Sequence, residues 1–201
     1  MPNLMFLRHA ETELNKTGIF AGRTDCNITK EGFEQAKEIL KDDEKNFDYI
    51  YCSPLKRTKQ TLDAILPNIT PIIDERITEI CIGEWEGKKK ESFDKNLVAL
   101  YRAGQYTPPG AETTSQVDKR VCNFIETLFN TYKNNERILI VTHNGVMRSI
   151  KRNFVRNYDN IMSKNLGSIV LTEEDYKYYL EKRKEKEITR YFNSSLFLYW
   201  E

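Results

Sequence analysis

Short continuous apolar runs alternate along this chain with segments in which apolar residues recur every three or four positions. The runs at residues 4–7, 49–52, 72–73 and 138–142 have the length and the composition of buried strands. Most of these runs are followed by a segment whose apolar residues have helical spacing. Strands that alternate with helices predict an α/β sandwich with a mostly parallel central sheet.

Polar residues mark where the helices are expected to begin. Thr29 precedes a helical pattern and is a suitable N-cap, and Thr113 with Gln116 forms a capping-box pattern before a long one. Ser53, followed by Pro54, is expected to cap a third helix directly after the strand at residues 49–52.

Three segments fit the alternation less well. Residues 88–112 hold a short helical pattern and then a Pro-Pro-Gly loop. Residues 155–190 carry a second helical pattern, with Thr172 and Asp175 as an expected capping box. The last run, residues 195–200, alternates and predicts a closing strand at a sheet edge, where it could pair with a second copy in a homodimer.

Composition narrows the class of protein. With 201 residues, 39% of them hydrophobic and 30% charged, the chain is expected to be one globular domain spanning residues 1–201. A net charge of +1 argues against a general electrostatic attraction to nucleic acid or to an anionic membrane. No apolar run is long enough to span a bilayer and the N-terminus has no signal-peptide pattern, so we expect a cytoplasmic protein with reduced cysteines.

The chain has only two histidines, and both follow a predicted strand. His9 comes after residues 4–7, and His143 after residues 138–142. A single histidine is usually a capping or core residue. In an open parallel sheet, however, ligands bind beyond the carboxyl ends of the strands, so neighbouring strands would bring both imidazoles into one crevice.

Arginines accompany the histidines at the same predicted strand ends. Arg8 precedes the first histidine, and Arg57 lies in the first turn of the helix after residues 49–52. A surface salt bridge is the alternative role for Arg57 taken alone. Guanidinium groups bind phosphate oxygens in a bidentate manner, so the combination predicts a phosphate pocket.

Four segments resemble the motifs of the histidine phosphatase superfamily, in the branch that includes cofactor-dependent phosphoglycerate mutase. They are residues 7–12 (LRHAET) with Asn15, 53–61 (SPLKRTKQT), 79–87 (EICIGEWEG) and 141–148 (VTHNGVMR). Ala10 and Asn144 depart from the glycines that the family commonly has. The resemblance covers residues 4–150 in the family's order. It implies a phosphoglycerate mutase-like three-layer α/β/α sandwich, in which much of residues 155–190 is a helical insertion near the C-terminus.

The resemblance also implies roles. His9 would attack phosphorus as a neutral imidazole and form a phosphohistidine. Glu79 would act as acid and then as base, with Glu75, Glu84 and Glu86 as rival carboxylates. The remaining residues implied to surround the phosphoryl group are Arg8, Asn15, Arg57, His143 and Asn144. Neither a metal nor a cofactor is implied.

Three functions remain open at this point. The first is a phosphoric monoester hydrolase of the histidine acid phosphatase type that acts on a small-molecule phosphate ester. The second is a phosphoglycerate mutase, and it is disfavoured because residues 85–88 (WEGK) match the phosphatase version of that motif. The third is an inactive binding module, which the intact set of motif residues disfavours. The sequence leaves open which ester is the substrate, from sugar phosphates to phosphotyrosine peptides.

Overall fold

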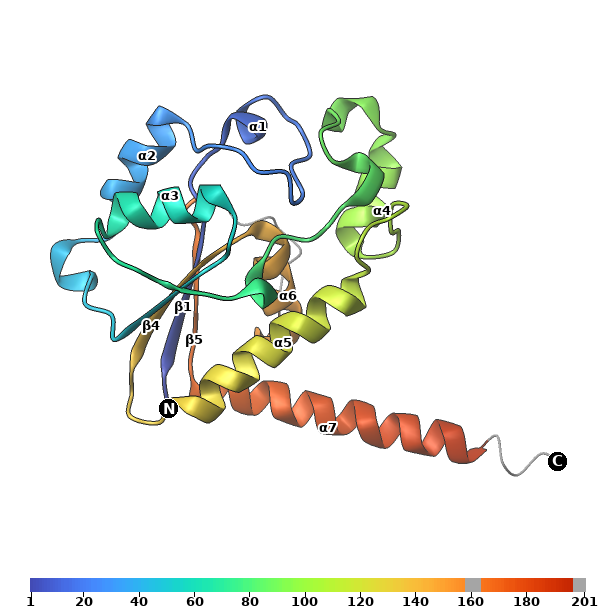
Figure 1. Ribbon diagram of the computed structural model, residues 1–201. Coiled ribbons are helices and arrows are strands. Elements are labelled where there is room, and N and C mark those ends of the chain that lie inside the picture. Colours follow the sequence, from blue (N-terminus) through green and yellow to red (C-terminus); the bar gives the residue numbers. More distant parts are fainter. Residues whose placement is uncertain (158–163, 197–201) are drawn as a thin grey trace.

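The computed structural model describes residues 1–157 and 164–196, with side chains as far as Glu187. Helices cover both faces of a central five-stranded sheet (Figure 1). The strands are β1 (Asn3–Arg8), β2 (Tyr49–Cys52), β3 (Ile72–Ile73), β4 (Arg137–Thr142) and β5 (Ser168–Leu171). The α-helices are α1 (Glu13–Lys16), α2 (Lys30–Lys37), α3 (Lys56–Ile65), α4 (Lys95–Ala103), α5 (Thr114–Thr131), α6 (Asn144–Phe154) and α7 (Glu173–Leu196).

The sheet has the strand order β3-β2-β4-β1-β5. β4 lies at its centre and pairs in parallel with both β1 and β2, whereas β5 pairs antiparallel with β1. Residues 138–142 of β4 are all buried, because helices cover both faces of the sheet at this strand. The predicted mostly parallel sheet is confirmed.

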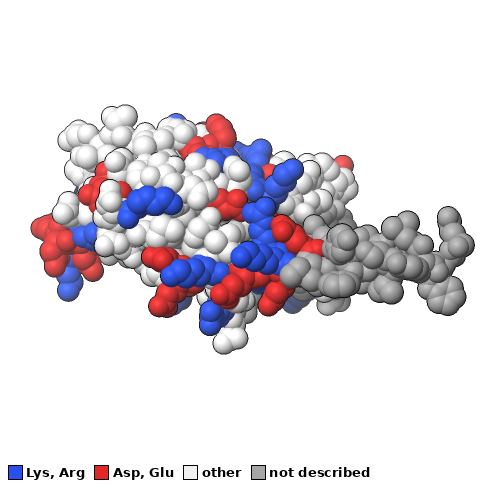
Figure 2. Space-filling view, turned by 90° about the horizontal axis from the view of Figure 1, so that it is seen from below, with Lys and Arg blue, Asp and Glu red and all other residues white. Residues whose placement is uncertain are grey.

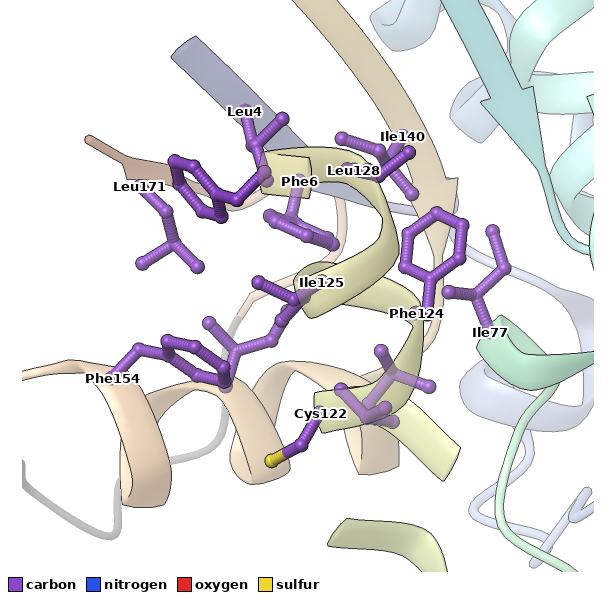
Figure 3. Close-up of a cluster of buried hydrophobic side chains, with 14 of the residues drawn as sticks. Leu4, Phe6, Ile77, Cys122, Phe124, Ile125, Leu128, Ile140, Phe154 and Leu171 are labelled. Atoms are coloured by element: carbon purple, nitrogen blue, oxygen red, sulfur yellow. The ribbon is translucent and has the colours of Figure 1, made fainter. Parts of the chain in front are cut away.

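The side chains on the two faces of β1 pack into two separate hydrophobic cores. Leu4 and Phe6 point to the face covered by α5, α6 and α7, where they pack with Phe124, Leu128 and Phe154 (Figure 3). Leu7, one residue further, points to the opposite face and packs with apolar residues of α2 and α3. This alternation produces the three layers, because successive strand residues face opposite sides of a sheet.

Of the helix caps predicted at Thr29, Thr113 and Ser53, the first two are confirmed and the third is wrong. The hydroxyl of Thr29 accepts from the Gly32 amide, and Thr113 forms the expected box with Gln116. Helix α3, however, begins at Lys56 with Leu55 as its N-cap residue, two residues later than predicted for Ser53. The hydroxyl of Ser53 accepts from the Leu55 amide at 3.4 Å, just before the helix, and lies 2.7 Å from a ring nitrogen of His143.

The C-terminal part of the chain departs from the prediction at two places. The predicted helix pattern over residues 155–190 contains strand β5, which forms a sheet edge beside β1. The strand was not predicted because its apolar run, Ile169 to Leu171, lies within the longer segment to which helical spacing was assigned. The amide and hydroxyl of Thr172 donate to the carboxylate of Asp175 at the start of α7, so one half of the expected capping box is formed.

The closing strand predicted for residues 195–200 is wrong where the structure can be compared with it. Ser195 and Leu196 continue helix α7, and residues 197–200 lie outside the described residues. The sheet edge beside β1 is formed by β5. None of the helices, over the part of the chain that is described, combines the length and apolarity needed to cross a membrane.

Candidate active site

The two histidines lie side by side because their strands are neighbours. β1 and β4 pair with Arg8 opposite Thr142, so the next residue of each strand leaves the sheet at the same level. The ring centroids of His9 and His143 are 5.2 Å apart. The two imidazoles meet at the carboxyl ends of the strands as predicted, but only His9 lines the pocket there.

A pocket opens at these strand ends, and the structure brings nearly all of the predicted site residues to its wall. The predicted residues that line it are Arg8, His9, Asn15, Arg57, Glu79 and Asn144. His143 is fully buried and does not line the pocket, but lies against His9 and Arg57.

His9 is held in one tautomer. Its Nδ1 lies 2.7 Å from the carbonyl oxygen of Ala10, which can only accept, so Nδ1 carries the proton. Burial, together with the positive charges of Arg57 and Arg8, lowers the pKa of His9 well below its ordinary value of 6.5. The ring is therefore neutral, and Nε2 keeps its lone pair for attack on an electrophile.

His143 has the opposite tautomer. The Nε–H of Arg57 donates to its Nδ1 at 3.2 Å, so the proton of the neutral ring resides on Nε2, which donates to the Ser53 hydroxyl at 2.7 Å. Burial and the charge of Arg57 lower the pKa of His143 well below 6.5 as well. In this geometry both ring nitrogens are engaged, and His143 orients Arg57.

Arg57 is buried and fixed by a neighbouring loop. Its Nη2 donates to the carbonyl of Gly22 at 2.8 Å and its Nη1 to that of Thr24 at 3.0 Å. Together with the bond to His143, these contacts hold the guanidinium in the pocket wall. A guanidinium fixed in this way pays little conformational entropy when it binds an anion.

The loop that fixes Arg57 is itself fastened by Glu86. One carboxylate oxygen accepts from the amides of Arg23 and Ile82, at 3.1 and 3.2 Å, and the other accepts from the hydroxyl of Thr24 at 3.2 Å. Glu86 therefore has a structural position, and it is not in the pocket wall. Of the other rival carboxylates, Glu84 is exposed, and Glu75 is an exposed partner of the Thr78 hydroxyl.

Glu79 is the only acidic residue among the described residues that line the pocket. Its Oε1 accepts from the amides of Ile80 at 2.9 Å and Gly145 at 2.8 Å. Because Oε1 is occupied by two donors, the proton of the acid form belongs on Oε2. A side chain at residue 145 would strike this carboxylate, since an added Cβ would lie 2.3 Å from Oε1.

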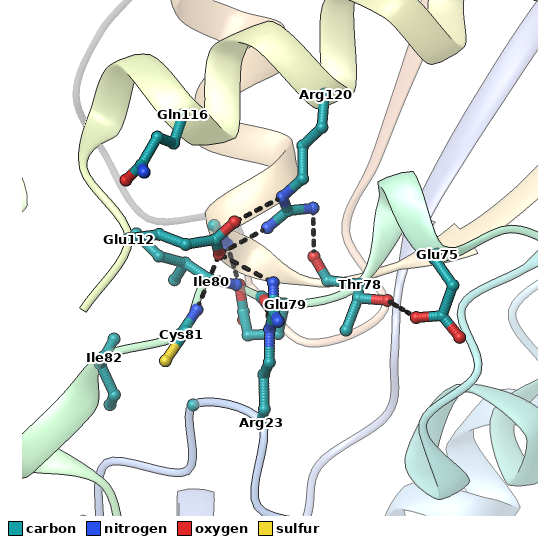
Figure 4. A network of polar contacts seen from close by, with 12 residues as sticks. Arg23, Glu75, Thr78, Glu79, Ile80, Cys81, Ile82, Glu112, Gln116 and Arg120 are labelled. Atoms are coloured by element: carbon teal, nitrogen blue, oxygen red, sulfur yellow. Dashed lines mark hydrogen bonds and ion pairs between the residues drawn. The ribbon is translucent and has the colours of Figure 1, made fainter. Parts of the chain in front are cut away.

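A network of charged residues supports the segment that carries Glu79 (Figure 4). Arg120 pairs with Glu112 through two hydrogen bonds of 2.9 and 3.1 Å and donates to the carbonyl of Thr78. Glu112 also accepts from the Cys81 amide, and Arg23 donates to the Glu79 carbonyl at 3.0 Å. No local sequence pattern marks these residues, because their contacts join segments that are far apart in the chain.

Asn165 is a second kind of residue that was missed. Its side-chain amide donates to Oδ1 of Asn15 at 3.2 Å and to the carbonyl of His9 at 3.1 Å. The Oδ1 atom of Asn15 also accepts from the Thr12 amide. With its oxygen occupied, Asn15 presents its NH₂ group as the donor for a ligand in the pocket.

The pocket concentrates positive charge. Five basic residues line it, namely Arg8, Arg57, Lys90, Arg102 and Arg148, against the single acidic Glu79. The whole chain has a net charge of +1, and on the face at the amino ends of the strands Lys and Arg side chains interleave with Asp and Glu (Figure 2). Within the described residues, no group of three His, Cys, Asp or Glu side chains is placed to hold a metal ion. Anions are therefore the ligands that this pocket attracts.

The motif residues thus converge on one anion-binding pocket, and comparison with known proteins agrees. The family model of the histidine phosphatase superfamily (branch 1) matches residues 4–185. The chain belongs to this superfamily. Over 158 residues it is 32% identical to phosphoserine phosphatase 1 of Hydrogenobacter thermophilus, covering 75% of this chain and 74% of the relative.

Mutases of the superfamily are similar to the chain to nearly the same degree. A 2,3-bisphosphoglycerate-dependent phosphoglycerate mutase of Parvibaculum lavamentivorans is 31% identical over 165 residues, covering 75% of this chain and 79% of the relative. The crystal structure of phosphoglycerate mutase from Thermus thermophilus superimposes with a TM-score of 0.70 at 26% identity, covering 85% of this chain and 93% of that chain. The phosphoglycerate mutase-like fold is confirmed.

Proposed function

We propose that this protein hydrolyses small phosphomonoesters through a phosphohistidine on His9, with Glu79 as acid and then as base. The observation that carries the proposal is the state of His9. Its ring is neutral, its proton is fixed on Nδ1 by the Ala10 carbonyl, and it lines a pocket that also contains Arg8, Arg57 and Glu79. A nucleophile, cations and a carboxylate in one pocket are what phosphoryl transfer requires.

In the first step, Nε2 of His9 attacks phosphorus. The N–P bond forms while the P–O bond of the ester breaks, and the departing alkoxide takes the proton from Oε2 of Glu79. Arg8, Arg57 and the Asn15 amide stabilise the negative charge on the phosphoryl oxygens. The alcohol leaves, and His9 carries the phosphoryl group.

In the second step, Glu79 acts as the base. Its carboxylate takes a proton from a water molecule, the water oxygen bonds to phosphorus, and the N–P bond breaks. The products are inorganic phosphate and His9, whose Nδ1 has kept its proton throughout. Glu79 is again in its acid form, so the cycle closes without another reactant.

The proposal includes independence from metal ions. In this mechanism Arg8 and Arg57 supply the positive charge that a bound cation supplies in many other phosphoryl-transfer sites. Both guanidiniums are largely buried, which strengthens their interaction with an anion.

The test is an assay of phosphate release from small phosphomonoesters in the presence of EDTA. We expect activity that survives EDTA, that falls by at least about 10³-fold in His9→Ala, and that falls about 10²-fold or more in Glu79→Gln. Glu84→Gln is the matched control, because Glu84 is an exposed carboxylate of the same segment. Full activity in His9→Ala, or complete loss in EDTA, would overturn the mechanism.

The relatives named as phosphoserine phosphatase and phosphoglycerate mutase make phosphoserine and 3-phosphoglycerate the first substrates to try. A mutase would interconvert 3- and 2-phosphoglycerate faster than it releases phosphate. That result would replace hydrolysis by transfer as the main activity, although His9 would keep its role.

A further inference from the structure

The residue that follows the proposed nucleophile holds the proton of its ring. Nδ1 of His9 donates to the carbonyl of Ala10 at 2.7 Å, so the position of this carbonyl decides which nitrogen of His9 keeps its lone pair. Ala10 is completely buried, and its backbone groups therefore need partners within the protein. A group that holds the backbone of Ala10 thus also holds the tautomer of His9.

The hydroxyl of Thr61 is such a group. It accepts from the amide of Ala10 at 2.9 Å and donates to the carbonyl of Arg57 at 2.7 Å. Thr61 is completely buried and lies one turn after Arg57 on helix α3. Because its proton is given to the Arg57 carbonyl, the hydroxyl turns a lone pair toward Ala10. One oxygen atom therefore ties the loop of the nucleophile to the helix that carries Arg57.

The residues on both sides of Ala10 are held by other parts of the fold. The amide of His9 donates to the last residue of β4 at 2.9 Å, and the carbonyl of Glu11 accepts from the Thr29 amide at 2.8 Å. These two contacts do not involve Thr61. Loss of the Thr61 hydroxyl therefore removes the partner of the Ala10 amide while its neighbours stay anchored.

The guanidinium of Arg57 is held by contacts other than the one to Thr61. Two carbonyls of the neighbouring loop and Nδ1 of His143 bind its nitrogens, whereas Thr61 contacts only its backbone carbonyl. Removal of the Thr61 hydroxyl should therefore leave the phosphate-binding charge in place. The orientation of His9 and the binding of phosphate can thus be separated in one variant.

Thr58 provides a comparison on the same helix. It is also completely buried, and its hydroxyl donates to the carbonyls of Ser53 and Leu55 at 2.9 and 2.6 Å. Both of these partners lie just before α3. The two threonines share burial and a bond to a backbone carbonyl, so the contact with Ala10 is what distinguishes Thr61.

We propose that Thr61 is a positioning residue for the reaction, which through Ala10 keeps the proton of His9 on Nδ1 and leaves Nε2 free to attack. This inference rests on the proposed function, in which Nε2 bonds to phosphorus. Without the hydroxyl, the buried Ala10 amide has no acceptor, and the backbone turns to find one. The Ala10 carbonyl then leaves Nδ1, and the ring proton can move to Nε2, where it blocks the attack.

Nuclear magnetic resonance tests the tautomer directly, because the chain has only two histidines. In a neutral ring the ¹⁵N signals of the protonated and the unprotonated nitrogen are well separated, so long-range ¹H–¹⁵N spectra at about pH 8 identify each tautomer. We expect Nδ1–H for His9 and Nε2–H for His143. Thr61→Val keeps the shape of the side chain and should populate Nε2–H in His9, with His143 unchanged as an internal reference. A His9 ring that stays in the Nδ1–H form in Thr61→Val would overturn the inference.

Kinetics provide a second measurement on the same variant. Thr61→Val should slow phosphohistidine formation in an alkali-quenched single turnover about tenfold or more. Inhibition by inorganic phosphate, which reports binding alone, should change by no more than about threefold. An equal loss of phosphate binding and of rate would show that Thr61 acts on the whole pocket, and would overturn the role assigned to it.

Three further variants complete the test. Thr61→Ser restores the hydroxyl and should keep the tautomer and the rate, so losses as large as those in Thr61→Val would contradict the inference. Thr58→Val should lower stability without changing the tautomer of His9. Thr61→Ala removes the same hydroxyl without adding an atom and takes the place of Thr61→Val if that variant does not fold. Full activity in His9→Ala would instead overturn the proposed function, whatever the tautomer.

Discussion

The Nε2–H of His143 donates to the hydroxyl of Ser53 across 2.7 Å, between two residues that are completely buried. On the other side of the ring, Nδ1 accepts from Nε of Arg57. Arg57, which can only donate, therefore determines the tautomer of His143, and Ser53 holds the other side of the ring. The ring in turn orients Arg57.

Removal of the Ser53 hydroxyl should disturb this arrangement. We expect Ser53→Ala to lower the free energy of unfolding by about 1–3 kcal/mol, because a buried N–H loses its acceptor. It should also lower kcat/KM for a phosphomonoester roughly 10- to 100-fold, because the guanidinium of Arg57 is no longer fixed. Urea unfolding and steady-state kinetics measure the two effects.

Ser149→Ala is the control for this prediction. Ser149 is also a buried serine, and its hydroxyl donates to Asp118 at 2.6 Å outside the pocket wall. We expect it to lose stability without a comparable loss of activity. If both variants lost activity equally, the effect of Ser53→Ala would come from destabilisation alone.

Gly145 leaves room for the proposed acid. A Cβ at this position would lie 2.3 Å from Oε1 of Glu79 and 2.8 Å from the side chain of Ile80. Gly145→Ala should therefore displace the carboxylate and slow the first turnover of an alkyl phosphate roughly 10²-fold. Release of 4-nitrophenolate, which departs without a proton, should keep its first-turnover rate within a few-fold. Equal losses with both leaving groups in a rapid-quench experiment would contradict the acid role.

Glu86 should affect activity through the loop that holds Arg57. Glu86→Ala removes the carboxylate that accepts hydrogen bonds from Arg23, Ile82 and Thr24. Because these charge-assisted hydrogen bonds are lost, we expect kcat/KM to fall roughly tenfold or more. Glu84→Ala removes an exposed neighbouring carboxylate and should change kcat/KM by no more than about twofold. Similar kinetics of the two variants would show that the loop is held without Glu86.

The two buried histidines should make stability depend on pH. Burial, with the charge of Arg57, keeps the pKa of His9 and of His143 well below 6.5 in the folded protein. In the unfolded chain each pKa returns to about 6.5, so the unfolded state binds more protons between that value and the lower folded pKa. The stability is therefore complete above about pH 7 and is lost as the pH falls below 6.5.

The expected slope is about 1.4 kcal/mol per pH unit for each histidine within this window. His9→Asn removes one titrating group, so the stability of the variant should fall less steeply, by about that amount, as the pH falls below 6.5. Urea unfolding at several pH values measures the difference. An unchanged slope would mean that His9 is already charged in the folded protein.

Local patterns were enough to predict most of the elements and the centre of the site. The central strands β1 and β4 contain continuous apolar runs because both of their faces are covered. His9 and His143 directly follow these strands in the sequence. The cap at Thr29 and the box at Thr113 involve contacts within three residues. Such features depend on neighbouring residues and are therefore visible in one chain.

Contacts between distant segments could not be predicted in the same way. Ser53 has the composition of a cap, but it binds a histidine 90 residues away. The apolar residues of β5 lie within a longer segment with helical spacing, and their pairing with β1 makes them a strand. The helical pattern predicted for residues 155–190 therefore includes a segment that forms a strand.

The sequence by itself determined that two histidines and two arginines follow buried strands, within four motifs that stand in the order of one superfamily. Only the tertiary structure decided which carboxylate lines the pocket, how His143 is oriented by Ser53, and that Lys90 turns inward whereas Lys88 and Lys89 do not. The reason is physical. Periodicity is set by neighbours along the chain, whereas burial, tautomer and the sum of charge in a pocket are set by groups that meet only after folding.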